Sequence, residues 1–286
     1  MKYKKIIFLF SVFLPLSVLL RLVQLSFTTD YATGFYIKEF ESNGKAMLLV
    51  LFALAFAPAV FALFSHRSPA HPPKPNIFIS AASFAVAVSI ICELCFETLP
   101  LTITVWQVAL LRISGVASAL FFILFGLKTF INLPLPNICT AIPTVYIIFR
   151  IICDFTAISA LALISENLIL MFAYCTVLLF FLQFAKLYTG QDPEYNFRKL
   201  LSSGLASIIL CALQSVPHFV LKTLTGYSFM HTSPTAAISL FVMGVFIATF
   251  LFSHFSFFNS CLTDEEQNRR QNILLEKITN LCKKFK

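Results

Sequence analysis

Long apolar runs separated by short polar segments dominate this chain. Each run is close to the roughly 20 residues that a helix needs to cross a bilayer. The segments between the runs carry proline, glycine and charged residues, which are typical of loops, and they are too short to hold a soluble domain. The pattern predicts eight membrane-spanning helices, over residues 6–27, 46–64, 77–96, 105–126, 140–163, 168–188, 199–221 and 236–257.

The composition agrees with an integral membrane protein. Of the 286 residues, 58% are apolar and 12% are charged, and the mean hydropathy is +0.86. So few polar residues cannot cover the surface of a water-soluble globule. We therefore predict an all-α fold, a polytopic transmembrane helical bundle of about eight spans in residues 1–258, with the lipid bilayer as its surroundings.

The first apolar run follows a basic start, Met1 to Lys5, which is also how a secretory signal begins. The run lacks a small-x-small cleavage site and continues past Arg21 to Phe27, beyond the usual length of a signal core. We interpret it as an uncleaved first span. Cleavage would leave seven spans instead of eight.

Lysine and arginine are distributed unevenly between the two predicted sides of the membrane. Fifteen of the 21 lie at the side that carries both termini, three lie at the other side, and three lie within spans. Because cytoplasmic flanks are enriched in these residues, we predict cytoplasmic termini and a location in the cell membrane. The same arrangement accounts for the net charge of +8, so we expect no nucleic-acid partner.

The segment 259–286 differs from the rest of the chain. Thr263 and Glu266 make a capping box, and apolar residues recur at helical spacing from Leu274 to Phe285. Lysines accompany the apolar stripe, so we predict a cytoplasmic amphipathic helix that lies on an anionic membrane leaflet. A short coiled coil with a second copy is the alternative.

The first and fifth runs resemble each other. Pro15 precedes Arg21 in the first run much as Pro143 precedes Arg150 in the fifth, and the third and seventh runs also share short strings. If the chain is duplicated, spans one to four match spans five to eight in a parallel 4+4 repeat, as in some transporters. Chance similarity between apolar strings is the alternative, and the fourth and eighth runs show little match.

Polar and ionisable residues inside the runs fall in one half of the predicted membrane. Helix rise places Arg150 close to the bilayer centre and Arg21 roughly 7 Å further outward. The inner halves of the spans are nearly free of ionisable groups, which predicts a polar cavity that opens to the extracytoplasmic side. The six residues of this layer that we take as ligand-binding candidates are Arg150, Asp154, Arg112, Arg21, Glu93 and His218.

Arg150 and Asp154 stand four residues apart in the fifth run, so their side chains lie on the same face of a helix. A charge at this depth is costly and needs either a partner or a function. One interpretation is an ion pair that neutralises itself and sets how the bundle packs. The other is a ligand site centred on Arg150.

The three arginines within the runs predict an anionic ligand if their side chains meet. For Arg21 the simpler expectation is that the long side chain reaches the outer interface. If it instead joins Arg112 and Arg150, the acidic residues Asp154 and Glu93 cannot neutralise all three cations. An anionic lipid headgroup or a small anionic solute would then complete the charge balance.

Helix packing is the simpler explanation for two further features. Gly115 and Ala119 place small residues one turn apart, which favours close contact between helices. Pro217 stands beside Gln214 and His218 in the seventh run, where it is expected to kink the helix rather than to expose a ligand site. Cys92 and Cys95 form a CxxC, but on a predicted helix without the context of a redox or metal site. We find no catalytic signature and no cofactor motif in the sequence.

The segment Ile142 to Phe155, IPTVYIIFRIICDF, and the following span to Tyr188 resemble uncharacterised multi-pass membrane proteins of Gram-positive, Firmicutes-like anaerobes. The resemblance implies a multi-pass membrane protein. That family has no known activity, so the resemblance implies no substrate, cofactor or site residue.

Three functions are consistent with these observations. The first is a permease, or a protein that binds a small anion or a lipid headgroup, with an outward-facing site. The second is a scaffold, sensor or partner subunit whose polar layer is structural. The third is a membrane enzyme with Asp154, Glu93 or His218 as acid or base, and it ranks last because no catalytic signature supports it.

Overall fold

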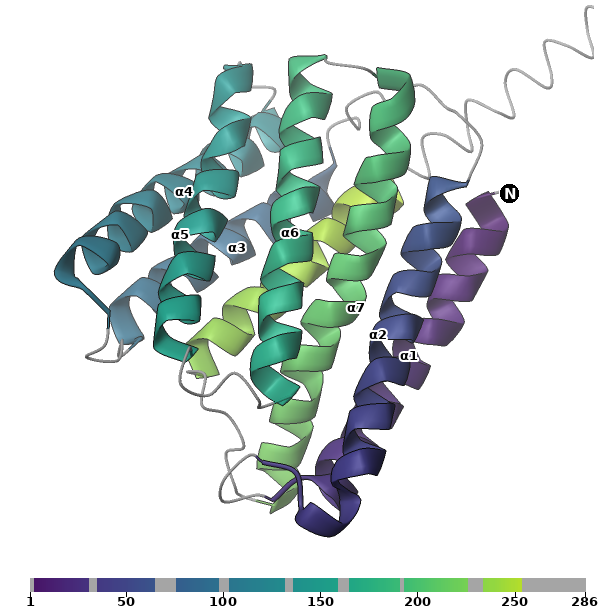
Figure 1. Cartoon of the computed structure of the whole chain (residues 1–286). Coiled ribbons are helices and arrows are strands. Elements are labelled where there is room, and N and C mark those ends of the chain that lie inside the picture. Colours follow the sequence, from purple (N-terminus) through teal and green to yellow (C-terminus); the bar gives the residue numbers. More distant parts are fainter. Residues whose placement is uncertain are drawn as a thin grey trace, which may run out of the picture.

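The computed structural model is an up-and-down bundle of eight helices, each long and apolar enough to cross a membrane (Figure 1). It confirms the predicted all-α transmembrane bundle. The C-terminal segment predicted to form an amphipathic helix lies outside the described residues. The structure describes residues 3–30, 35–64, 76–97, 103–131, 136–158, 165–190, 193–225 and 234–253.

Seven of the helices carry labels in Figure 1, and the eighth, Pro234–Ser253, is called the final helix here. Short 3-10 helices, η1 (Lys38–Phe40) and η2 (Asn137–Ala141), precede the second and fifth helices. The labelled helices are α1 (Tyr3–Thr28), α2 (Glu41–Leu63), α3 (Ile77–Phe96), α4 (Val105–Ile131), α5 (Ile142–Ile158), α6 (Ser165–Thr189) and α7 (Pro193–Thr225).

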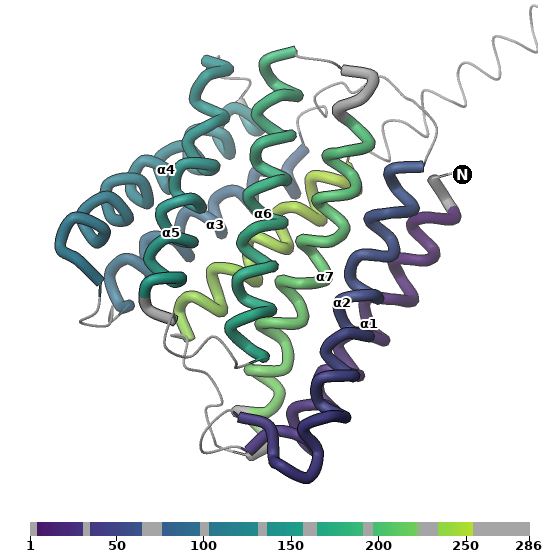
Figure 2. Tube along the Cα trace, viewed as in Figure 1, coloured from purple at the N-terminus to yellow at the C-terminus, as the bar shows by residue number. Residues whose placement is uncertain are grey.

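Successive helices run in opposite directions, as the chain path in Figure 2 shows. The start of α1 and the end of the final helix therefore lie at the same end of the bundle, called the N-terminal end below. The opposite end, where α1 connects to α2 through Tyr36, is called the Tyr36 end. At the Tyr36 end α1, α3, α5 and α7 finish, and α2, α4, α6 and the final helix begin.

The helices form two groups around a centre. α1 pairs with α2, and both pack against α7, whereas α3, α4 and α5 pack in sequence on the other side (Figure 1). The final helix lies among α4, α6 and α7. Phe246 contacts Phe122 of α4 and Phe181 of α6, and a Cβ at Gly204 of α7 would lie 2.7 Å from Leu251.

Two helix boundaries differ from the prediction in ways that affect the site. α2 begins at Glu41 rather than near residue 46, because Glu41 pairs with Lys45 one turn later, at 2.6 Å, in an exposed first turn. The fifth span begins as a 3-10 turn at Asn137, and α5 ends at Ile158. Arg150 is thus eight residues, or roughly 12 Å, from the end of α5. It is equally far from the start of α5, so it lies at the middle of this helix, in keeping with the central position predicted from the sequence.

The packing does not repeat between the two halves of the chain. α6 packs closely along α7, whereas α2 and α3, the pair that a 4+4 repeat would match to them, do not pack together in the described structure. α1 and α2 also form a separate pair at one side of the bundle, while α5 and α6 belong to its centre (Figure 1). These helix pairs give the 4+4 repeat no support, and the repeat stays a prediction.

Phenylalanine side chains fill the interior towards the N-terminal end. They form a continuous set of ring contacts between α4, α6 and the final helix, with centroid distances of 4.8 to 6.4 Å. We call this set the Phe cluster: Phe121, Phe122, Phe125, Phe180, Phe181, Phe184, Tyr188, Phe246 and Phe250. Such offset and edge-to-face contacts fill space without polar atoms.

Buried ionisable side chains gather at the opposite end. Within the described ranges every buried charged or histidine side chain lies between the middle of its helix and the Tyr36 end: Arg21, Glu93, Arg150, Asp154, Glu166 and His218. The sequence-based prediction of one polar half and one apolar half is therefore confirmed. The Phe cluster closes the apolar half.

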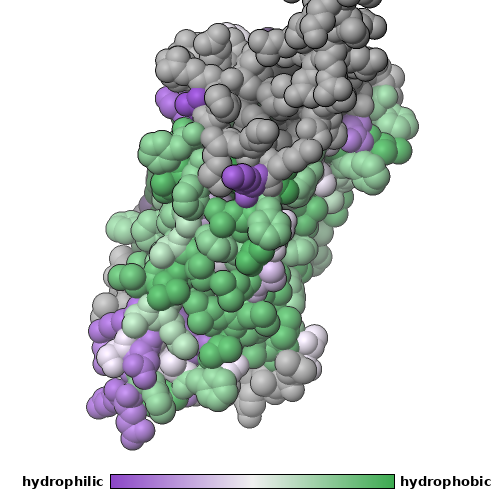
Figure 3. Space-filling model, turned by 90° about the vertical axis from the view of Figure 1, so that its right-hand side faces the viewer, coloured by the Kyte–Doolittle hydropathy of each residue, from purple (hydrophilic) through white to green (hydrophobic). Residues whose placement is uncertain are grey.

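The outer surface is apolar between the two ends. Figure 3 shows a hydrophobic belt on the face that contains α1 and α2, with hydrophilic residues towards the ends. On α1 the exposed positions recur every three or four residues and include Phe8, Leu16 and Phe27, at 71%, 46% and 68% exposure. This stripe suits contact with lipid chains.

Close helix contacts explain the small residues of the fourth span. A Cβ at Gly115 would lie 2.8 Å from Leu94 of α3 and 3.2 Å from Tyr146 of α5, and Ala119 is buried. The predicted packing role of this small-residue face is confirmed. α7 remains a continuous helix through Pro217.

Candidate functional site

The structure divides the predicted polar layer into separate parts. Arg150 with Asp154 and Glu93 forms one cluster between α3 and α5. Arg21 and His218 line a pocket between α1, α6 and α7. Arg112 belongs to neither: it is exposed on α4 and makes no ion pair with a described residue. The three arginines therefore do not converge, because the three side chains lie in different parts of the bundle.

The first part is the Arg150 cluster, defined as Arg150, Asp154, Glu93 and Glu97. Nε of Arg150 donates a hydrogen bond to Oδ2 of Asp154 at 3.0 Å. Its two terminal nitrogens donate to the two oxygens of Glu97 in a bidentate pair, with Nη2 to Oε1 at 2.6 Å. Nη1 also lies 2.8 Å from Oε1 of Glu93. Arg150, 2% exposed, is thus surrounded by three carboxylates.

Three helices hold this cluster in place. Glu93 and Glu97 lie one turn apart at the end of α3, whose last turn Glu97 closes by donating its backbone N–H to the carbonyl of Glu93 at 2.9 Å. The ring of Tyr174 on α6 lies 5.9 Å from Cζ of Arg150 and adds a cation–π contact. The guanidinium fork is thereby fixed between α3, α5 and α6.

The predicted pairing of Arg150 with Asp154 is confirmed, but it accounts for a small part of the cluster. Glu97 provides the bidentate contact, and it is not among the six candidates proposed from the sequence. The signal was present, since Glu93 and Glu97 have the four-residue spacing that puts both carboxylates on one face of the third span. An anion is not required to neutralise Arg150.

The second part begins on the inward face of α1, which is polar. Ser17, Arg21, Gln24 and Thr28 recur at spacings of four, three and four residues, and all are buried. Arg21 is 1% exposed. The expectation that it reaches the outer interface is therefore wrong: the residues that share its face point into the bundle, and the lipid-facing stripe occupies the other face of the helix.

A chain of hydrogen bonds holds the Arg21 side chain. Nη1 donates to Oε1 of Gln24 at 2.6 Å and to Oγ of Ser165, the first residue of α6, at 3.2 Å. Nε2 of Gln24 donates to the hydroxyl of Tyr36 at 3.1 Å and to the carbonyl of Gly44 at 2.8 Å. This Arg21 network, Arg21, Gln24, Tyr36, Gly44 and Ser165, ties α1 to α2 and α6.

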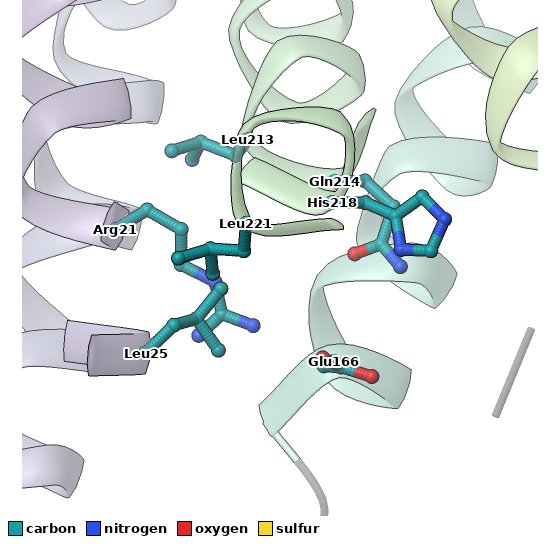
Figure 4. Close-up of a pocket in the computed structure, with 7 residues that line it drawn as sticks. All are labelled: Arg21, Leu25, Glu166, Leu213, Gln214, His218 and Leu221. Carbon is teal, nitrogen blue, oxygen red and sulfur yellow. The ribbon is translucent and has the colours of Figure 1, made fainter. Parts of the chain in front are cut away.

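The Arg21 network borders a pocket at the junction of three helices (Figure 4). The cavity itself is small, about 10 Å³, which is room for about one water molecule. Figure 4 shows the Arg21 side chain extending from α1 towards the space between α6 and α7. The lining residues are Arg21, Leu25, Glu166, Leu213, Gln214, His218 and Leu221.

Arg21 has an unused hydrogen-bond donor at this pocket. Its Nε has no hydrogen-bond acceptor among the residues that the structure describes. Glu166 acts on Arg21 through its charge, but no ion pair to Arg21 forms within 4 Å among the described residues. Gln214 and His218, one turn apart on α7, line the same pocket. The arrangement can accept a small anionic or hydrogen-bond-accepting group.

Sequence reasoning missed Glu166, Ser165 and Tyr36. Glu166 could have been found, because it starts the sixth span on the same predicted side of the membrane as Arg21. Tyr36 gave no signal, since it lies in a short connection without a motif. Its position depends on how α1 and α2 meet.

Tyr36 is held by a glycine on α2. A Cβ at Gly44 would overlap the Tyr36 ring, and partial burial raises the pKa of the Tyr36 hydroxyl above its usual value. Tyr36 therefore stays neutral at physiological pH and accepts the hydrogen bond from Gln24. Gly44 is needed here for close approach.

We expect Gly44→Ala to displace the Tyr36 ring and to lower the free energy of unfolding by about 1–3 kcal/mol, the usual effect of inserting a group into a packed site. The matched control is Asn43→Ala, at an exposed neighbouring position of α2. Thermal unfolding of both purified variants in detergent measures the difference. Equal stability of the two would show that Tyr36 does not pack on Gly44.

In the described part of the chain, no group of three or more His, Cys, Asp or Glu side chains is placed to hold a metal ion. No protein-family model, no curated protein and no solved structure matches this chain. The resemblance to membrane proteins of Gram-positive anaerobes stays a prediction.

Proposed function

We propose that this multi-pass membrane protein binds a small anionic group in the Arg21 pocket, as a permease or a solute- or lipid-binding protein. The observation that carries the proposal is a guanidinium 1% exposed, without an ion pair among the described residues, beside a pocket. A buried cation lacking a close counterion is costly. An anion hydrogen-bonded to Arg21 offsets that cost.

The lining of the pocket narrows the class of ligand. Arginine presents five N–H donors in a planar fork that suits carboxylate and phosphate oxygens. The carboxylate of Glu166 lines the same pocket and disfavours a ligand with two negative charges. Leu25, Leu213 and Leu221 supply an apolar wall. This lining favours a monoanion with an apolar portion, either a carboxylate solute or a phosphodiester headgroup. Because the cavity has room for about one water molecule, α1, α6 and α7 must move apart to admit it.

The distribution of positive charge supports an outward-facing pocket. Lys128 and Lys186 lie in the last turns of α4 and α6, at the N-terminal end of the bundle. Lys38 and Lys45 lie at the Tyr36 end, in keeping with the fifteen-to-three distribution in the sequence. We propose that the N-terminal end is cytoplasmic and that the membrane is the plasma membrane. The pocket then faces the extracytoplasmic side.

The Phe cluster supports a transport cycle with two states. A site near one face, with a tightly packed apolar half beyond it, is what an outward-facing state of an alternating-access carrier requires. Passage to the other side would need α4, α6 and the final helix to separate at the Phe cluster.

Ligand binding can be tested with the purified protein and two probes. We expect native mass spectrometry to detect retained phosphatidylglycerol, or thermal unfolding to shift to higher temperature with hexanoate. Arg21→Met should weaken binding of whichever probe binds to wild type by at least about tenfold, because the planar set of N–H donors is lost. Arg112→Met removes an exposed arginine and should leave binding unchanged.

The two probes distinguish a lipid headgroup from a free carboxylate. Circular dichroism and size-exclusion chromatography check that Arg21→Met remains folded. Equal binding of either probe by wild type and folded Arg21→Met, or no binding of either probe by wild type, would contradict the proposal.

A partner subunit is the second candidate function, and Arg112 is the observation in its favour. Arg112 is exposed on α4, beside the exposed apolar residues Leu110 and Ile113. An acidic residue of a partner helix would neutralise it within the membrane. Loss of a co-purifying membrane protein in Arg112→Met, but not in Arg21→Met, would favour this function.

A further inference from the structure

We propose that the Arg150 cluster is a proton-binding site, that Glu93 carries the proton, and that the proton exchanges with the Tyr36 end of the bundle. The inference does not depend on the Arg21 pocket, which is lined by different residues.

The charge of the cluster is the first step. Its four side chains comprise one cation and three carboxylates, all of them at most 10% exposed. If all three carboxylates were ionised, the cluster would carry two net negative charges in a poorly solvated interior. Uncompensated charge is costly there, and a carboxyl group avoids the cost by binding a proton.

The hydrogen bonds identify Glu93 as the carboxyl group that takes the proton. Asp154 and Glu97 both accept hydrogen bonds from Arg150, which favours their ionised forms. Among the described residues, neither oxygen of Glu93 accepts a hydrogen bond of full geometry, although Nη1 of Arg150 lies 2.8 Å away and the Ser239 side chain is near enough to act as a donor. Glu93 is also the least exposed of the three side chains, at 1%.

The residues around Glu93 do not supply a second cation. Arg150 is the one cation acting on Glu93 and Asp154 in the part of the chain that the structure describes. The other groups close to the cluster are neutral or acidic. They are Tyr146 and Cys153 from α5, Tyr174 from α6, Ser239 from the final helix and Glu97 from α3.

The position of the cluster sets the side from which a proton arrives. Glu97 is the residue at the end of α3, and Glu93 lies one turn deeper on the same helix face. The Phe cluster closes the other half of the bundle. A hydronium ion at the Tyr36 end transfers its proton to a carboxylate oxygen of Glu93, which leaves water and a neutral carboxylic acid.

Infrared spectroscopy of the protein in phosphatidylcholine vesicles tests this proposal, because a neutral carboxylic acid has its own C=O stretching band. We expect wild type to show this band at neutral pH and to lose it as the pH rises. Glu93→Gln, which mimics the neutral acid, should fold normally and lack the band. Glu39→Gln, at an exposed position of η1, should retain it.

Isotope labelling gives a second measurement that needs no variant. In wild type grown with carboxyl-¹³C glutamate, the band should move to lower frequency, which assigns it to a glutamic acid rather than to Asp154. Absence of the band in wild type between pH 5 and about 8, its persistence in Glu93→Gln, or its failure to shift on labelling would each overturn the proposal.

Discussion

Replacement of Arg150 by glutamine is expected to lower the free energy of unfolding by about 3–5 kcal/mol, the typical cost of removing one partner from a buried ion pair. Three carboxyl groups would then face one another without the guanidinium that joins them. The loss should be smaller at acidic pH, because protonated carboxyl groups need no cation. Thermal unfolding of the purified variant between pH 5 and about 8 measures both effects.

Two companion variants make this prediction specific. Arg112→Gln removes an arginine that is exposed and unpaired among the described residues, and it should change the stability by less than about 0.5 kcal/mol. Combining Arg150→Gln with Glu93→Gln, Glu97→Gln and Asp154→Asn should restore much of the loss, since no buried charge remains. If Arg150→Gln alone is as stable as wild type, the cluster does not hold α3 and α5 together.

Phe184→Ala should have the second large effect, because this ring is central to the Phe cluster. It is fully buried and contacts Phe125, Phe246 and Phe250 at centroid distances of 5.5, 6.4 and 5.1 Å. In a bilayer the unfolded helix also has apolar surroundings, so the cavity left behind is the main cost. A cavity of roughly 100 Å³ costs about 2–3 kcal/mol.

The matched control for Phe184→Ala is Phe155→Ala. Phe155 belongs to α5 and is 66% exposed, so its removal leaves no cavity. Unfolding of both variants in mixed micelles, by titration with a denaturing detergent, compares their stabilities. Similar stability of the two would mean that the N-terminal half is loosely packed, and the Phe cluster could not close it.

The polar residues show where sequence reasoning succeeded and where it stopped. Spacing alone predicted that Arg150 and Asp154 pair, because a helix brings positions four apart together. Spacing also holds the information that Arg21 faces inward, since it shares a face with Ser17 and Gln24 and lies opposite an apolar stripe. The partners Glu97 and Ser165 belong to other helices. Their choice depends on helix rotation, which hydropathy does not report.

The sequence by itself determined the all-α class, the eight apolar spans and the polar and apolar halves of the bundle, because the bilayer imposes a length and a polarity on every segment that crosses it. Tertiary structure alone decided which buried charges meet. In the folded bundle Arg150 contacts three carboxyl groups, whereas Arg21 lines a pocket. The reason is physical: lipid specifies what a helix may expose, whereas close packing between helices specifies which side chains face each other.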